Sequence, residues 1–202
     1  MYADEPPLGF DVLEVDDVAE GWEDGWRAFH HGVRVGRVWV GPPWEEPPAD
    51  TVGIVIDPGR AFGTGAHATT RLCLELLQDV EPASLLDVGC GSGVLSVAAA
   101  KLGFAPVHAV DIDEVSLETT RANAAANEVQ VAVGTELQPS QLAVMNIALD
   151  VVEQMLPELP VERAITSGYL ERDEPHAEGW QRLERRLSDG WAADLLERDE
   201  LA

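Results

Sequence analysis

Cysteine is scarce in this chain. Its 202 residues include only Cys73 and Cys90, and no histidine lies at metal-ligand spacing around either of them. This excludes a disulfide framework and a zinc site, both of which need clustered cysteines or cysteines paired with histidines. We expect two free thiols in a reducing cytoplasm and no bound metal.

Basic side chains are also scarce. Lysine and arginine total 13 against 37 acidic residues, the net charge is -24, and Lys101 is the single lysine. Direct nucleic-acid binding would need a basic stripe, which the sequence lacks. Two interpretations stay open together: a solvated acidic surface, as in a salt-adapted organism, and electrostatic attraction to a basic protein partner.

Long apolar segments are missing too. No stretch reaches the length of a membrane span, and no secretory signal opens the chain, so we expect a cytoplasmic protein with no membrane association. The length suits one domain or one domain with a small appendage. Residues 1–25 hold nine acids and no base. We therefore divide the chain into an acidic N-terminal segment and linker, 1–50, and a main domain, 51–202.

What the chain does contain is glycine in two closely spaced segments. Residues 56–70 read IDPGRAFGTGAHATT, and residues 87–93 read DVGCGSG. The second segment follows an apolar run, Ser84–Val88, and precedes an apolar helical pattern, Val94–Leu102, that Gly103 closes. Strand, glycine turn and helix together form a nucleoside-cradling unit, because glycine lets a ligand approach the backbone closely.

The glycine spacing indicates which ligand the second loop binds. Asp87, Gly89, Gly91 and Gly93 give D-x-G-x-G-x-G, which resembles motif I of the class I S-adenosylmethionine (SAM) methyltransferases. A dinucleotide site has G-x-G-x-x-G instead, and an acid beside its phosphates would be repelled. Asp87 near a sulfonium and an ammonium group is favourable. A degenerate dinucleotide-binding dehydrogenase is the alternative.

The remaining pattern alternates strands with helices. Such alternation predicts a mostly parallel, twisted sheet with helices on both faces, an α/β fold of the Rossmann-like methyltransferase class. Strands are expected at 33–40, 51–56, 84–88, 107–111, 130–133, 142–146 and 164–168, and helices at 69–78, 94–102, 116–127, 151–156 and 174–187. The strands after Gly190 look shortened.

Asp111 ends the strand that follows the glycine loop. An acid at this position can accept hydrogen bonds from both ribose hydroxyls of a nucleoside. The alternative is that Asp111 or Asp113 caps the next helix, and Asp113 suits that role well. We assign the ribose role to Asp111. Ile112, between the two acids, is expected against the adenine face.

Asn146 ends the strand 142–146, where ligands of open α/β sheets bind. Its side-chain carbonyl, with nearby backbone carbonyls, can accept hydrogen bonds from an amine and orient the nitrogen lone pair toward a methyl donor. The amine must also be neutral, and a nearby positive charge with partial burial lowers a lysine pKa. A cap or turn role is the alternative.

Other candidates are weaker. His67, in the first glycine segment, has no carboxylate at a readable spacing to orient it as a base, so a structural hydrogen-bonding role is favoured. Trp22 and Trp26, four residues apart, are expected in the core or a lid.

Taken together, these motifs resemble those of a specific family. The segment Asp57–Thr70, DPGRAFGTGAHATT, is similar to the signature of the ribosomal protein L11 methyltransferases, and the motif I loop, Val110–Asp113 and Asn146-Ile147 match as well. The resemblance covers roughly residues 20 to 170. It implies a SAM-dependent methyltransferase acting on amines of a ribosomal protein.

The resemblance also implies site residues. It puts Phe62, Thr64, His67 and Thr70 around SAM and Asn146 at both the cofactor and the acceptor amine. Members of the family carry a separate N-terminal substrate-recognition domain, which we expect this chain to lack. Three functions therefore compete: a methyltransferase acting on ribosomal protein L11 or another lysine-bearing protein, a small-molecule methyltransferase of the same fold, and a non-catalytic SAM-binding module.

Overall fold

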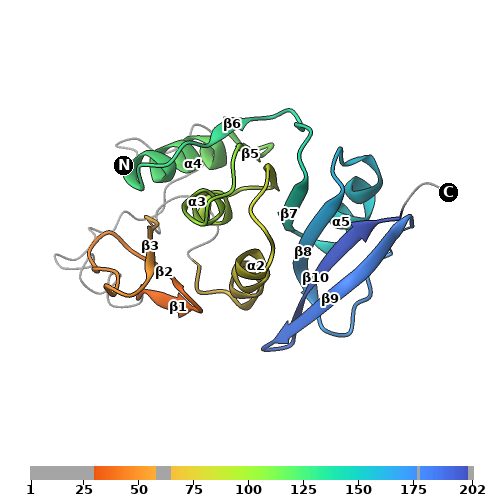
Figure 1. The fold of residues 1–202 in the computed structure, drawn as a ribbon, viewed down its shortest axis with the longest axis horizontal. Coiled ribbons are helices and arrows are strands. Elements are labelled where there is room, and N and C mark those ends of the chain that lie inside the picture. The colour runs from red at the N-terminus through yellow and green to blue at the C-terminus, as the bar shows by residue number, and fades with distance from the viewer. Residues whose placement is uncertain (1–29, 58–64, 177, 200–202) are drawn as a thin grey trace, which may run out of the picture. The chain divides into compact units, whose positions relative to one another are not determined.

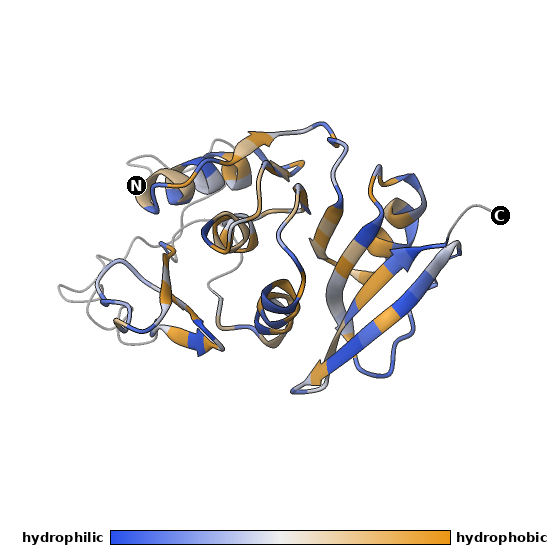
Figure 2. Ribbon diagram, viewed as in Figure 1, coloured by the Kyte–Doolittle hydropathy of each residue, from blue (hydrophilic) through white to orange (hydrophobic). Residues whose placement is uncertain are grey.

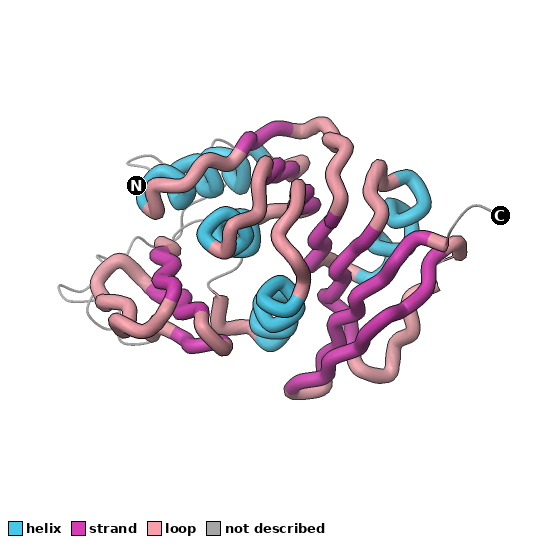
Figure 3. Tube along the Cα trace, in the orientation of Figure 1, coloured by secondary structure: helices cyan, strands magenta, loops and turns pink. Residues whose placement is uncertain are grey.

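A seven-stranded sheet organises the fold (Figures 1 and 3). The computed structural model describes residues 30–57, 65–176 and 178–199. The strand order is β6-β5-β4-β7-β8-β10-β9. The five strands from β6 to β8 in this order run parallel to one another, whereas β10 runs antiparallel to both β8 and β9. The strands are β4 (Leu85–Val88), β5 (Val107–Val110), β6 (Ala132–Gly134), β7 (Leu142–Asn146), β8 (Arg163–Leu170), β9 (Trp180–Ser188) and β10 (Trp191–Arg198).

The two central strands are apolar and buried. All four residues of β4 are buried, as are the first four of β7. Strands covered on both faces are expected to be continuously hydrophobic, because neither side meets water. Asp87 in β4 is the exception, and it lies near the strand's carboxyl end. The carboxyl ends of β4, β5 and β7 meet at one edge of the sheet, so the residues that follow them are brought together.

Helices cover both faces of the sheet. On one side, α2 (Ala68–Asp79) and α3 (Val94–Lys101) share a hydrophobic cluster with Ala124 of α4 (Glu114–Ala126). On the other, α5 (Leu149–Met155) and the short 3₁₀ helix η1 (Leu156–Glu158) pack in a second cluster. None of the helices in the described ranges has the length and apolar character needed to span a membrane.

A smaller three-stranded sheet packs against the same core. Its strands are β1 (Val33–Val35), β2 (Val38–Gly41) and β3 (Val52–Val55), with β2 between the other two. The single strand expected over 33–40 is broken into two by a turn at Gly36, whose φ is +57°. Val38 of β2 belongs to the same hydrophobic cluster as α2, and the compact unit begins at His31. The functional division of the chain at residue 50 stays a prediction.

Most of the elements expected from the sequence are confirmed. The α/β class, the parallel centre of the sheet and the helices on both faces are all present. The strand at 142–146 has the predicted bounds. The other predicted elements between residues 51 and 168 lie within about two residues of the expected bounds, the usual uncertainty at element ends.

The helix predicted at 174–187 is wrong. Residues 180–188 form strand β9, the outer strand of the sheet, which is mostly hydrophilic in Figure 2. The spacing of Trp180, Leu183 and Leu187 suits a helix, but both leucines are exposed and make no buried face. The turn that follows this segment determines that it forms a strand of a hairpin. Asp189 and Gly190 both have positive φ, as a two-residue hairpin turn requires, and they join β9 to an unshortened β10.

A buried polar cluster stabilises the antiparallel end of the sheet. Asp194 of β10 is fully buried and accepts a hydrogen bond from the Tyr169 hydroxyl at 2.8 Å. Arg185 of β9 donates to the same carboxylate at 3.4 Å. Burial raises the pKa of Asp194, while Tyr169 and Arg185 act in the opposite direction. The cluster joins β8, β9 and β10 through one carboxylate.

Candidate active site

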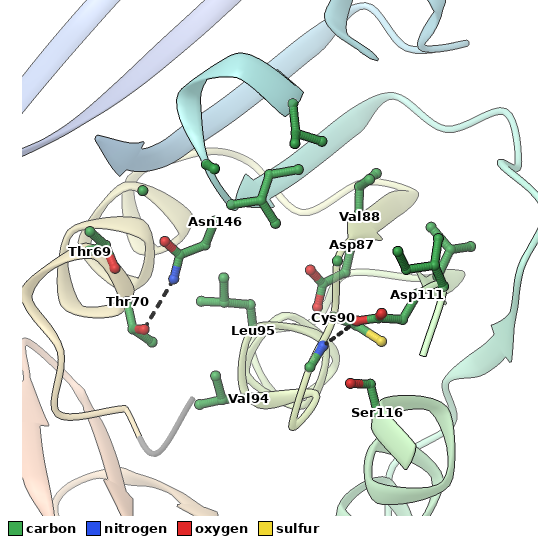
Figure 4. Close-up of a pocket in the computed structure, with 18 of the residues that line it drawn as sticks. Thr69, Thr70, Asp87, Val88, Cys90, Val94, Leu95, Asp111, Ser116 and Asn146 are labelled. Atoms are coloured by element: carbon green, nitrogen blue, oxygen red, sulfur yellow. Dashed lines mark hydrogen bonds between the residues drawn. The ribbon is translucent and has the colours of Figure 1, made fainter. Parts of the chain in front are cut away.

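A pocket of about 710 Å³ lies at the carboxyl ends of β4, β5 and β7 (Figure 4). Its wall includes the glycine loop after β4, the first turn of α2 and the first residue of β10. The volume is in the range of sites for drug-sized ligands. In open α/β sheets this edge is where ligands bind. The predicted site residues that line the pocket are His67, Thr70, Asp87, Gly89, Gly91, Asp111, Ile112 and Asn146.

The glycine loop turns the chain from β4 into α3. Gly89, Gly91 and Gly93 have φ values of 73°, 54° and 77°, a region that other residues adopt only at a cost. Gly89 and Gly91 line the pocket. Gly93 is the N-cap of α3, and a Cβ there would lie 2.8 Å from Thr120 side-chain atoms. Its lack of a side chain therefore serves the packing of α3 against α4.

Asp87 is a buried carboxylate at the floor of the pocket. Only 1% of the residue is exposed, and the Ser96 hydroxyl donates a hydrogen bond to it. Burial raises the pKa of Asp87 to about 7; the Ser96 hydrogen bond lowers it, and the nearby negative charge of Asp111 raises it. A cation entering the pocket would stabilise the ionised form.

Asp111 is held by backbone groups on both of its oxygens. Gly91 N–H donates to Oδ2 and Asp113 N–H donates to Oδ1, each at 3.0 Å. These bonds fix the carboxylate between the glycine loop and the start of α4. The helix-capping role of Asp113 is confirmed, because its side chain accepts from the N–H groups of Val115 and Ser116. Ile112 is fully exposed at the rim of the pocket.

Asn146 faces the other end of the pocket. Its Nδ2 donates a hydrogen bond to Thr70 Oγ1 at 3.1 Å, and no described residue donates to its Oδ1. In Figure 4 the carbonyl oxygen points away from Thr70. Gly168 of β8 lies close by, and a Cβ on it would stand 2.0 Å from the Ile147 carbonyl oxygen. Glycine at 168 therefore allows β8 to approach the chain that follows Asn146.

His67 starts helix α2 as its N-cap. Its Nδ1 accepts a hydrogen bond from Thr69 N–H at 3.4 Å and lies 2.9 Å from Thr69 Oγ1. This N-cap contact agrees with the structural hydrogen-bonding role favoured for His67, and its place around SAM stays a prediction. Its ring also packs edge-on against Trp191, with centroids 4.9 Å apart and planes at 69°. Both rings line the pocket at the end where Asn146 lies.

Several pocket residues were not predicted from the sequence. Trp191 is the main one, and the signal that could have found it is the Asp189-Gly190 turn immediately before it. Thr135, Leu137, Val151 and Met155 also line the pocket. Phe62, Thr64, Trp22 and Trp26 lie outside the described residues.

The expectation that this chain binds no metal stays a prediction. Cys73 and Cys90 are free and buried, and burial raises the pKa of the Cys90 thiol to about 12. Within residues 30–57, 65–176 and 178–199, no group of three or more His, Cys, Asp and Glu side chains is arranged to hold a metal ion.

Comparisons with known proteins give one consistent result. The model of the ribosomal protein L11 methyltransferase family matches residues 7–197. A ribosomal protein L11 methyltransferase of Legionella pneumophila (strain Paris) is 40% identical over 195 residues, covering 86% of this chain and 67% of that protein. One from Thermoanaerobacter sp. (strain X514) is 41% identical over 161 residues, 74% of this chain and 52% of its own length.

A solved structure is similar as well. The ribosomal protein L11 methylase of Lactobacillus delbrueckii subsp. bulgaricus superimposes with a TM-score of 0.75 at 28% identity. The match covers 84% of this chain and all of that chain. Sequence and structure comparisons therefore agree on one group of enzymes.

Proposed function

This chain belongs to the ribosomal protein L11 methyltransferase family, and we propose that it transfers methyl groups from SAM to amines of a protein, either lysine side chains or the N-terminus. One observation carries the proposal. A single pocket has a carboxylate fixed beside a glycine loop at one end and an Asn carbonyl oxygen without a described donor at the other. A nucleoside and an amine could thus meet within one cavity.

The residues at the glycine-loop end fit SAM. Asp111 offers the remaining lone pairs of a carboxylate already oriented by Gly91 and Asp113, as two ribose hydroxyls require. Exposed Ile112 supplies an apolar surface for adenine. Asp87 supplies a negative charge near the sulfonium and ammonium groups, and Gly89 and Gly91 leave the backbone accessible. When bound, SAM supplies an electrophilic methyl group.

The residues at the Asn146 end fit an amine. Since Nδ2 of Asn146 is bound to Thr70, Oδ1 is left to accept an amine hydrogen. Accepting that hydrogen would turn the nitrogen lone pair toward the methyl donor, a positioning effect. We assign Asn146 this catalytic role and a cofactor contact. Partial burial in the pocket would help to keep the acceptor amine neutral.

The other predicted cofactor residues complete the proposal. We assign Thr70 and His67 to the wall between cofactor and acceptor, since both line the pocket. Phe62 and Thr64 are assigned to SAM from the family signature. Gly93 contributes by letting α3 start close to Thr120.

The acceptor protein is proposed from the family and from charge. The relatives are named ribosomal protein L11 methyltransferases, which supports ribosomal protein L11 or another lysine-bearing protein as the substrate. A chain with net charge -24 would attract a basic protein, and that attraction would weaken as salt screens it. We propose no direct nucleic-acid contact and a cytoplasmic location.

The test uses isotopically labelled SAM. The purified chain is incubated with a lysate of its own organism, and the protein and small-molecule fractions are analysed by mass spectrometry at several salt concentrations. We expect label on protein amines, with kcat/KM falling as salt rises past physiological strength. Label confined to small molecules, with no salt dependence, would contradict the proposal and support the small-molecule alternative.

A further inference from the structure

The turn between β9 and β10 lies against the first turn of α2. Its two central residues are Asp189 and Gly190, and Ser188 pairs with Trp191 across it. Arg71 of α2 forms an ion pair with Asp189 through Nη2. The partners are 118 residues apart in sequence, so only the fold brings them together. In Figure 1 the tip of this hairpin lies beside α2.

The same turn places Trp191 in the wall of the pocket. Trp191 immediately follows Gly190, and its ring lies edge-on to that of His67 at a centroid distance of 4.9 Å. His67 is the N-cap of α2, and Thr70 in the first turn of that helix accepts the hydrogen bond from Asn146. The first turn of α2 therefore contacts Asn146 through Thr70 and the hairpin turn through Arg71.

We propose that the Arg71–Asp189 ion pair is a positioning contact for the methyl acceptor. The pair holds the β9–β10 turn against α2 and so keeps Trp191 in the wall of the acceptor channel, which is the Asn146 end of the pocket. This rests on the proposed function and specifies the acceptor as an amine on an aliphatic stem. The stem of a lysine packs along an aromatic ring while its nitrogen reaches a polar group beyond. At the Asn146 end of the pocket that polar group is the Asn146 carbonyl oxygen.

The environment of Arg71 suits a contact that orders a turn. Its side chain is 32% exposed, and its Nε is buried without a hydrogen-bond partner among the described residues, whereas Asp189 is 69% exposed. Pairs this exposed contribute little to global stability. Loss of the pair should therefore move the turn rather than unfold the domain, and small displacements near reacting groups have large kinetic effects.

The hairpin offers a matched control on the same helix. Arg186 of β9 pairs with Asp79 at 2.5 Å, at the last turn of α2. This second pair joins α2 to β9 itself and is similarly exposed, with Asp79 at 61%. Arg186 also pairs with Glu75 and Glu184. Neither Arg186 nor Asp79 lines the pocket. Removing the Arg186–Asp79 pair should leave Trp191 and the acceptor channel unchanged.

The experiment compares Arg71→Met and Asp189→Gly with Asp79→Asn in the full chain. Glycine at 189 keeps the positive φ of +52° without strain, so the backbone of the turn is retained while the side-chain contacts with Arg71 and the Ser188 hydroxyl are lost. Arg71→Met removes the ion pair and leaves the Ser188 contact in place. Two quantities are measured: the nuclear magnetic resonance shifts of the His67 ring protons, which sense the Trp191 ring current, and steady-state kinetics with a lysine-bearing protein acceptor. We expect shifted His67 resonances and a roughly tenfold higher acceptor KM in the first two variants, with SAM affinity unchanged. Asp79→Asn should match the wild type.

Unchanged His67 resonances in Arg71→Met and Asp189→Gly would overturn the proposal, as would an acceptor KM that stays at the wild-type value or rises equally in Asp79→Asn. A wild-type chain that methylates no protein would instead contradict the proposed function. In that case the His67 resonances still decide whether the ion pair positions Trp191.

Discussion

Asn146 donates a hydrogen bond from Nδ2 to Thr70 Oγ1 at 3.1 Å, which joins the end of β7 to the first turn of α2. Because the amide nitrogen is used in this bond, the side chain is oriented, and its carbonyl oxygen, which points away from Thr70 in Figure 4, has no donor among the described residues. The proposed handling of the acceptor amine depends on this orientation.

Replacing Asn146 by alanine should therefore reduce turnover by about 10²-fold or more, because the amine loses its orienting acceptor. Thr70→Val should act in the same direction but less strongly, since it only releases the Asn146 amide to rotate. Single-turnover rates with saturating SAM would measure both. Full activity in Asn146→Ala would remove this residue from the mechanism.

Asp111→Ala should weaken SAM binding by about 1–3 kcal/mol, the usual penalty for leaving hydrogen-bonding groups unsatisfied. Asp113→Ala is the matched control, since it removes a helix cap two residues away and should lower the free energy of unfolding by about 0.5–2 kcal/mol without a comparable loss of affinity. Calorimetry with SAM and denaturant titration separate the two effects. Equal SAM affinity in both variants would show that Asp111 does not hold the ribose.

The raised pKa of Asp87 predicts a pH-dependent affinity. Its folded-state pKa is about 7 against an ordinary 3.8, so the folded chain binds more protons than the unfolded chain between about pH 4 and pH 7. The contribution of Asp87 to stability is fully present below about pH 4 and is lost as pH rises through 7. A cationic ligand favours the ionised form, so SAM affinity should rise with pH up to about 7.

The measurement for Asp87 is calorimetry of SAM binding in two buffers with different ionisation enthalpies at pH 6. A released proton makes the observed heat depend on the buffer. In Asp87→Asn that dependence should disappear. A buffer-independent heat in the wild type would show that Asp87 does not titrate on binding.

The sequence allowed most of the fold up to residue 168 to be predicted, because strong local signals agree there. The glycine loop, the apolar four-residue strands and the cap at Asp113 each specify their own segment. The prediction of a helix at 174–187 was wrong for a physical reason. In β9 the apolar residues Leu183 and Leu187 face solvent, so their spacing carries no information about a buried face. The Asp189-Gly190 pair correctly indicates a hairpin turn, but the helical spacing of the apolar residues before it favoured a helix.

Only part of the site could be predicted from the sequence. Asp111 and Asn146 follow strands directly, and the edge where parallel strands end is a known place for ligands. Trp191 was not predicted, because placing it requires recognising the hairpin at Asp189-Gly190, whose second strand joins the sheet antiparallel, after the parallel strands that define that edge. The contact of Arg71 with Asp189 spans 118 residues and depends on that same strand.

Asp194→Ala should lower the free energy of unfolding by about 3–5 kcal/mol, because it leaves the mostly buried Arg185 without its buried carboxylate and removes one of the acceptors of the Tyr169 hydroxyl. Glu174→Ala, which removes the exposed partner of the same arginine, should have a much smaller effect. Urea denaturation of the two variants tests the comparison. Equal midpoints would show that the buried cluster does not stabilise the antiparallel end of the sheet.

The most direct test of the proposed function is the intact mass of purified ribosomal protein L11 from the same organism after incubation with this chain and SAM. We predict mass increases by whole methyl groups, located on lysine side chains or the N-terminal amine, and almost none with Asn146→Ala over the same time. An unchanged mass of ribosomal protein L11 with the wild-type chain, under conditions where calorimetry shows SAM bound, would contradict its assignment as the acceptor.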